Sequence, residues 1–175
     1  MAVARRLLGR TLVSDLGGAR VAGIIIETEA YLGRHDPASH AWRGRLHRLY
    51  QGIYAPSGSW YVYRSYGVHW CLNLTAPTAR DGGAVLIRAV VPIEGIEVIR
   101  RRRGTVAERD LTNGPGKLGQ AFAITGANDG MRAGRGSPLR LLPHRDRKAN
   151  RRIILTPRIG ITRAADWPLR FLLRD

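Results

Sequence analysis

The chain has 175 residues, 44% of them hydrophobic, which is enough for one compact domain (residues 1–175) with a buried core. Lysine and arginine number 29 against 13 acidic residues, and the net charge of +16 points to a polyanionic partner, nucleic acid ahead of an acidic membrane surface. The single cysteine, Cys71, excludes a disulfide framework and a thiolate zinc cluster, and no apolar run is long enough to span a bilayer, so we expect a soluble intracellular protein.

The first predicted elements are a short helix and a hairpin. Met1–Leu8 is predicted to be helical, and two strands, Arg10–Asp15 and Ala19–Glu29, flank the turn residues Gly17–Gly18. If the second strand stays extended, its alternation places one set of residues on a single face. That set is Val21, Ile25, Glu27, Glu29 and Tyr31.

A long basic stretch without a regular pattern, Gly33–Gly58, follows this hairpin. Loops of that length inside compact domains are often functional. The aromatic-rich segment WYVYRSYGVHWCLNL predicts two strands with a turn at Ser65–Gly67. Ala84–Val91 is predicted to be an apolar strand that ends at Pro92.

The last part of the chain alternates helices, a loop and short strands. Ile93–Arg103 and Gly114–Thr125 are predicted helices, and Ala133–Asn150 is a basic loop. The closing strands are predicted at Arg151–Leu155, Arg158–Thr162 and Leu169–Leu173. Because strands outnumber helices and lie mostly in hairpins, we expect an α+β domain with a largely antiparallel sheet.

Glu29 is the first candidate for chemistry, because it ends an apolar strand beside Tyr31 at the start of the basic loop. A carboxylate there can take a proton from water and stabilise a developing positive charge; an ordinary ion pair with an arginine is the alternative. Glu27 and Glu29 together suggest the acid pair of a sugar hydrolase, but neighbours on one strand face do not flank a bond from opposite sides. Arg88, within an apolar strand, is expected to face a carboxylate or water.

Tyr66 lies at the predicted turn of the aromatic hairpin, where packing partners are scarce, so it is a candidate wedge or stacking platform for bases. His35, His40 and His47 match no usual zinc spacing, and we expect no metal. NGPGK at Asn113–Lys117 offers backbone amides and one lysine to a phosphate, without the spacing of a nucleotide-binding P-loop.

Several long motifs, in this order, resemble the alkyladenine or methylpurine DNA glycosylases over nearly the whole chain. They are ETEAYLG (Glu27–Gly33), ASHAWRGR (Ala38–Arg45), YVYRSYGVHWCLN (Tyr61–Asn73), AVLIRA (Ala84–Ala89), NGPGKLGQAFAI (Asn113–Ile124) and RIGI…DWPLRF (Arg158–Phe171). The resemblance implies a curved antiparallel sheet with flanking helices, a protruding DNA-intercalating hairpin, no metal or organic cofactor and no Schiff-base intermediate.

The resemblance also implies a role for each matching residue. Glu29 would activate water, and Arg88 would hold that water together with a carbonyl near Ile159–Ile161. Tyr66 would fill the gap left by a flipped nucleotide. The base would be bound by Tyr31, His40 and Tyr63, with Asn73 narrowing the pocket against guanine. Phosphates would be held by Arg43, Arg45, Lys117 and Arg158.

Two departures from the family stand out: Val68 replaces a frequent methionine after the hairpin turn, and Leu46–Tyr54 lacks the usual pattern. The expected partner is double-stranded DNA with a damaged purine, bound by a monomer in the cytoplasm or on the nucleoid. A DNA-binding damage sensor without chemistry and an RNA-binding protein remain alternatives. A lyase needs an amine nucleophile, and the only lysines are Lys117 and Lys148, so a monofunctional glycosylase is expected.

Overall fold

The computed structural model describes residues 1–76, 81–144 and 152–174, which form a mixed α+β fold around one curled sheet. The strands are β1 (Arg10–Ser14), β2 (Val21–Leu32), β3 (Trp60–Ser65), β4 (His69–Thr75), β5 (Gly83–Glu94), β6 (Leu139–His144), β7 (Arg152–Thr156) and β8 (Arg170–Arg174). The helices are α1 (Ala2–Leu7), α2 (Ile96–Arg103) and α3 (Pro115–Ala121). Short 3-10 turns include η1 (Gly33–His35), η2 (Trp42–Gly44), η3 (Arg48–Tyr54), η5 (Glu108–Asp110) and η6 (Gly126–Asn128).

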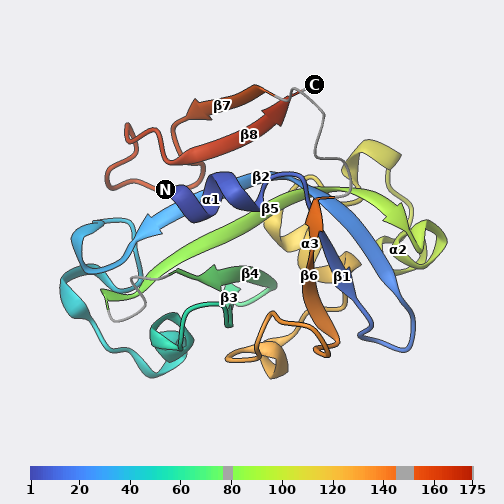
Figure 1. Ribbon diagram of the computed structural model, residues 1–175, viewed down its shortest axis with the longest axis horizontal. Coiled ribbons are helices and arrows are strands. Elements are labelled where there is room, and N and C mark those ends of the chain that lie inside the picture. Colours follow the sequence, from blue (N-terminus) through green and yellow to red (C-terminus); the bar gives the residue numbers. More distant parts are fainter. Residues whose placement is uncertain (77–80, 145–151, 175) are drawn as a thin grey trace.

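The sheet is antiparallel throughout, with the order β3-β4-β5-β2-β1-β6 and the β7–β8 hairpin attached to β2 (Figure 1). Along one edge, β2 pairs first with β1, through Val21–Ile24, and then with β8, through Glu27–Glu29. Its other edge pairs with β5 along nearly its whole length. The second half of β2 therefore lies between β5 and β8, with a neighbour on each side.

Two β-bulges lie opposite each other on β2 and β5. Ile25 pairs with Val90 and Glu27 with Ala89, so Ile26 is an extra residue; Thr28 then pairs with Ile87, which leaves Arg88 extra on β5. A bulge bends its strand and shifts the alternation of side chains. Ile25 packs in the main core, and beyond the bulge Ala30 joins that core. Glu27, Glu29 and Tyr31 therefore face the opposite side. The single face predicted for Val21 through Tyr31 is wrong for this reason.

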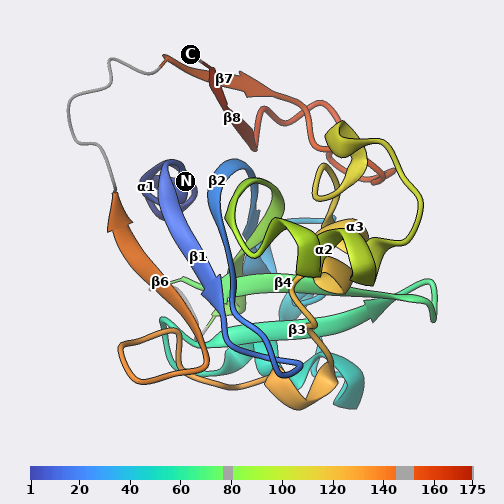
Figure 2. The ribbon, with the colours of Figure 1, turned by 90° about the vertical axis from the view of Figure 1, so that its right-hand side faces the viewer.

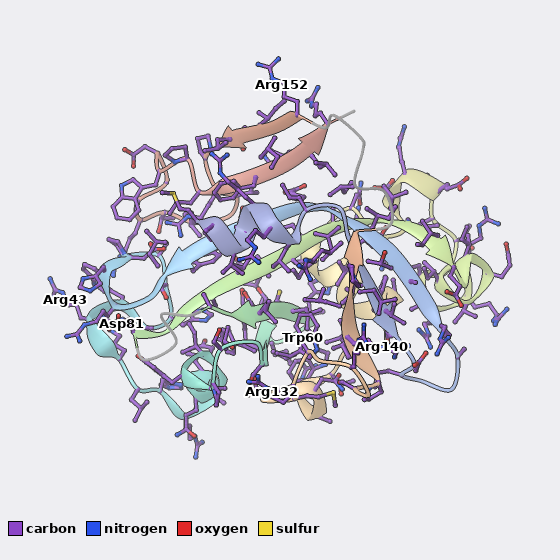
Figure 3. The ribbon with its side chains drawn as sticks, viewed as in Figure 1. Arg43, Trp60, Asp81, Arg132, Arg140 and Arg152 are labelled. Carbon is purple, nitrogen blue, oxygen red and sulfur yellow. The ribbon has the colours of Figure 1, made fainter. Side chains whose placement is uncertain are left out.

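The main core lies between the sheet and the helices, and its largest buried side chains include Trp60, Phe122, Phe171 and Ile99. The indole of Trp60 donates a 2.8 Å hydrogen bond to the carbonyl of Leu139, which ties β3 to the start of β6 (Figure 3). Helix α1 packs on β2, where the Thr28 hydroxyl donates to the carbonyl of Ala4. A smaller cluster around Ala41, Ile53, Tyr61 and Ala84 supports the loops before β3.

Most predicted elements are confirmed: helix α1, both hairpins, the basic stretch with only 3-10 turns, and the strands β7 and β8. Strand β5 continues past Pro92, because β4 pairs with β5 only at residues 84–86 and a register shift beside Gly23 accommodates the proline. Helix α2 consequently begins at Ile96, not Ile93. Gly95 enables this start: its φ is +70°, and a Cβ there would lie 2.3 Å from the carbonyl oxygen of Arg20.

Three further predictions are wrong. Helix α3 ends at Ala121, not Thr125, because Ala123 adopts φ 54°. The predicted loop Ala133–Asn150 contains strand β6, which is stabilised by pairing with β1. Arg158–Thr162 is not a strand; Gly160 has φ +76°, and the amide of Ile159 binds a carboxylate instead of a neighbouring strand.

Gly119 brings helix α3 close to strand β4. A Cβ at this position would lie 2.2 Å from the carbonyl oxygen of Trp70, which is backbone and cannot rotate away. We expect Gly119→Ala to lower the free energy of unfolding by about 1–3 kcal/mol and Tm by roughly 2–4 °C per kcal/mol, measured by thermal unfolding. Gly134→Ala is the matched control, because a Cβ there meets nothing within 4 Å. Equal Tm values for the two variants would contradict this packing.

Candidate active site

A cavity of about 440 Å³ opens between the β2–β5 pair, the β3–β4 hairpin and the loop at residues 159–161. Such a volume lies within the range of about 300–1,000 Å³ that is typical of small-molecule sites. The cavity is lined mostly by aromatic and apolar side chains, with a few polar groups among them. The polar and charged lining residues include His40, Asn73, Arg64 and Arg88.

Glu29 lies fully buried at the back of this cavity, behind three of its lining residues. Carboxylate Oε1 accepts a 2.8 Å hydrogen bond from the amide of Ile159 and lies 3.3 Å from Nη1 of Arg88. Oε2 accepts a 3.0 Å hydrogen bond from the Tyr31 hydroxyl. Burial and then the charge of Glu29 raise the pKa of Tyr31, so this hydroxyl stays protonated and donates. The carboxylate is thus held from three directions.

Glu27 holds the arginine that contacts Glu29. Its Oε1 accepts hydrogen bonds from Nε of Arg88 at 2.6 Å and Nε of Arg170 at 2.7 Å. The expectation that Arg88 faces a carboxylate is confirmed. Burial opposes the charge of Arg88, but Glu29 and Glu27 together raise its pKa, so the guanidinium stays a cation. The bulge at Arg88 places it over both carboxylates.

The walls of the cavity are aromatic rings from three segments. Tyr31, His40 and Tyr63, predicted to surround a base, all line it. The imidazole of His40 packs edge-on to the Tyr63 ring at 4.6 Å between centroids, and its Nδ1 lies 2.7 Å from the Tyr61 hydroxyl. Burial lowers the pKa of His40 to about 4, so the imidazole is uncharged at neutral pH.

Asn73 lies on β4 within the cavity wall and is buried. Its side-chain amide donates 3.1 Å and 3.4 Å hydrogen bonds to the carbonyls of Tyr61 and Cys71. These two bonds fix the side chain, so that its position cannot yield to a bulkier ligand without losing them. Cys71 is buried beside it, and burial raises the pKa of the thiol, consistent with a small packed hydrophobe.

The β3–β4 hairpin extends from the body of the molecule, with Tyr66 at its tip (Figure 2). Tyr66 is 91% exposed, and it also lines the mouth of the cavity. The amide of Val68 donates to the carbonyl of Ser65, and Tyr66 and Gly67 have φ of 49° and 67°, as in a type I′ turn. A tyrosine in this left-handed conformation is unusual and costs roughly 1–2 kcal/mol. Because its side chain is almost fully exposed, packing does not explain its presence.

Arg158, for which a phosphate contact was implied, has no exposed side-chain surface, and its guanidinium is bound inside the protein. Its guanidinium forms a two-pronged pair with Asp36, at 2.5 Å and 2.9 Å, and donates to the carbonyl of Ala30. It also lies 4.7 Å from the centre of the Tyr31 ring. Asp36 in turn accepts from the amides of Leu32 and Ala38. This buried pair holds the 157–161 loop against β2, where Ile159 reaches Glu29.

The other implied phosphate contacts are at the surface. Arg43 and Arg45 are exposed on and after η2, and Arg43 points away from the body of the protein (Figure 3). Lys117, near the start of α3, is partly exposed and donates 2.8 Å bonds to Asp110 and Asn113. These cations remain accessible to an anion, and their role as phosphate contacts stays a prediction.

Several site residues escaped the sequence analysis. Tyr50 and Tyr61 contact His40, Arg170 contacts Glu27, Asp36 pairs with Arg158, and the amide of Ile159 binds Glu29. Asp36 lies in the long basic stretch, and nothing in that stretch indicates that it is buried. The backbone amide of Ile159 cannot be recognised as a donor from a sequence. The only usable signal was the unusual segment Leu46–Tyr54, which places a tyrosine beside the cavity.

Within the described residues, no three His, Cys, Asp or Glu side chains are grouped so that they could hold a metal ion. No helix in residues 1–76, 81–144 or 152–174 is long and apolar enough to cross a membrane.

Comparison with known proteins identifies the family of this chain. The family described as methylpurine-DNA glycosylase (MPG) matches residues 1–175. A protein of Rhodopseudomonas palustris (strain ATCC BAA-98 / CGA009) is 47% identical over 99% of this chain and 79% of its own length. Proteins of Granulibacter bethesdensis (48% identical, 97% of this chain and 77% of its own) and Methanoculleus marisnigri (44%, 98% and 88%) are similar as well. All three carry the name "Putative 3-methyladenine DNA glycosylase". The chain described above, with its buried glutamate behind an aromatic cavity, therefore belongs to the methylpurine-DNA glycosylase family.

Proposed function

We propose that this protein is a monofunctional DNA glycosylase, which removes damaged purines from duplex DNA during base-excision repair. The observation that carries the proposal is the position of Glu29, which is held by Arg88 and Ile159 behind an aromatic cavity beside an exposed hairpin tyrosine. The net charge of +16 supports a polyanionic partner.

A base inside a duplex cannot reach an enclosed cavity, so it has to be flipped out, at a cost of a few kcal/mol. Tyr66 would fill the gap left in the stack and offset part of that cost. The flipped purine would lie against the rings of Tyr31 and Tyr63, with His40 at its edge. Stacking of this kind favours an electron-poor ring, including one that bears a positive charge.

An alkylated purine is a good leaving group, so the glycosidic bond can break with little help to the departing base. As it breaks, positive charge grows on the deoxyribose, which Glu29 stabilises. A water held by Arg88 and a carbonyl of residues 159–161 then gives its proton to Glu29 and adds to the sugar carbon. Tyr31, Arg88 and Ile159 separate the carboxylate from bulk water, so only a water bound at this cluster reaches it.

The contacts of Lys117, the one lysine among the described residues, favour a hydrolytic reaction without strand cleavage. A lyase step needs an amine that attacks the sugar. Lys117 is bound by Asp110 and Asn113, and Lys148 lies outside the described residues. The product would be an abasic site that breaks only on treatment with alkali.

The decisive experiment incubates the protein with duplexes that carry one hypoxanthine, one ethenoadenine or random methylation. Alkali-dependent breaks at the lesion would establish a glycosylase. Breaks that form before alkali is added, together with a protein–DNA intermediate that borohydride traps, would overturn the monofunctional assignment. Lesion-selective binding without base release from any substrate would instead establish the alternative, a damage sensor on the same fold.

Tyr66 gives a separate prediction for the hairpin. We expect Tyr66→Ala to reduce excision from a lesion duplex by about 5–150-fold, because base–aromatic stacking contributes roughly 1–3 kcal/mol. Tyr66→Phe keeps the ring and should retain most activity. The measurement is the single-turnover rate of base excision as a function of protein concentration. Leu142→Ala, an exposed apolar residue on β6 at the opposite edge of the sheet, is the control; equal losses in both alanine variants would rule out a specific role for Tyr66.

A further inference from the structure

The segment that departs from the family pattern adds a ring to the cavity wall. Tyr50, on η3, stacks on the imidazole of His40 with 4.0 Å between ring centroids and 11° between planes. It is half-buried and lines the cavity. His47 packs against it at 5.3 Å, and Nδ1 of His47 accepts from the amide of Leu49, which holds the turn in place.

His40 is thereby fixed from three directions. Tyr50 covers one face, the Tyr63 ring lies perpendicular at its edge, and the Tyr61 hydroxyl contacts Nδ1 at 2.7 Å. Among the described residues no side chain or backbone group bonds to Nε2 of His40. That nitrogen is therefore the one left to a ligand in the cavity.

We propose that Tyr50 is a positioning and specificity-determining residue, whose stacked ring fixes the plane of His40 and shields it from water, so that the pocket accepts purines made cationic by alkylation. This rests on the proposed glycosylase function.

The electrostatics of the cavity support this role. The titratable groups packed against His40 are the hydroxyls of Tyr50, Tyr61 and Tyr63, and burial raises the pKa of Tyr61 and of Tyr63. Elsewhere the cavity is lined by Tyr31, Cys71, Arg64 and Arg88, and His47 lies beyond Tyr50. Burial lowers the pKa of His40 to about 4, so it adds no charge at neutral pH. An imidazolium there would repel a cationic base.

The first test needs no substrate. The nitrogen NMR signals of the His40 imidazole are followed from pH 4.5 to 8 in the wild type, Tyr50→Phe and Tyr50→Leu. Leucine is smaller than tyrosine and has no ring, so it leaves the face of the imidazole that Tyr50 covers open to water. We expect His40 to stay neutral above pH 5 in the first two proteins and to titrate near its ordinary value of about 6.5 in Tyr50→Leu. Unchanged titration in folded Tyr50→Leu, or the same shift in Tyr50→Phe, would overturn the role of the stacked ring.

The second test measures specificity. The single-turnover rate of excision of cationic 7-methylguanine is divided by the rate for neutral hypoxanthine, at pH 7.5 and at pH 5.5. With a His40 pKa near 6.5, its neutral fraction falls about tenfold between these values. We expect this ratio to fall about tenfold in Tyr50→Leu and to stay constant in the wild type, Tyr50→Phe and Leu49→Ala, a control at the exposed neighbouring residue.

The two proposals can fail separately. A merely structural role for Tyr50 would lower both rates at every pH and leave the ratio unchanged, which would overturn the specificity proposal. If the wild type releases neither base, the glycosylase function fails, while the NMR titration still decides whether Tyr50 controls His40.

Discussion

Glu29→Gln is expected to slow base release by about 10²-fold to 10⁴-fold, because it removes the group that takes the proton from water. Glutamine has the same shape and can keep the contacts of the carboxylate. Its carbonyl oxygen can accept from Ile159 and face Arg88, while its amide donates to the Tyr31 hydroxyl, which can rotate to accept. Arg88 also retains Glu27 as a partner. The fold and the cavity should therefore persist.

Single-turnover excision and DNA binding, measured on the same lesion duplex, test this expectation. Binding should be unchanged or tighter, since the protein loses one negative charge and its partner is a polyanion. Glu94→Gln is the control, because Glu94 is exposed at the far end of β5. A Glu29→Gln protein with the wild-type rate would show that another group activates the water, whereas equal loss of binding and excision would indicate structural damage.

Asp36→Asn is expected to lower the free energy of unfolding by about 3–5 kcal/mol, the usual cost of breaking a buried ion pair from one side. Neither Asp36 nor Arg158 has exposed side-chain surface, so asparagine leaves a buried guanidinium uncompensated. It also has one oxygen fewer for the amides of Leu32 and Ala38. At roughly 2–4 °C per kcal/mol, Tm should fall by about 6–20 °C.

Urea and thermal unfolding measure this loss. Glu97→Ala removes a carboxylate from an exposed pair with Arg100 and should change stability by no more than about 0.5 kcal/mol. Replacing both partners, as in Asp36→Leu with Arg158→Met, should recover part of the stability, because no charge is then buried alone. An Asp36→Asn protein as stable as the wild type would mean that water or a neighbouring group solvates Arg158.

Local patterns in the sequence were sufficient for much of the fold. The two hairpins follow from apolar alternation on each side of turn residues, at Gly17–Gly18 and at Tyr66–Gly67, and both were predicted at the right places. Arg88 was expected to meet a carboxylate because a bare charge in an apolar strand is too costly. Each of these inferences depends on residues that are close in the chain or on the properties of one side chain.

Tertiary structure decided the rest, because it depends on which distant segments meet. The resemblance implied a phosphate contact for Arg158, but Asp36, 122 residues away in the chain, binds its guanidinium in the interior. Strand β6 forms within a basic loop because β1 offers it an edge. The bulges at Ile26 and Arg88 are invisible to a two-residue period, yet they turn Glu27 and Glu29 away from the core and toward Arg88. The net charge and the motifs could therefore be recognised from the sequence alone. The environment of the buried Glu29 carboxylate could not, because it depends on how the strands of the sheet pair.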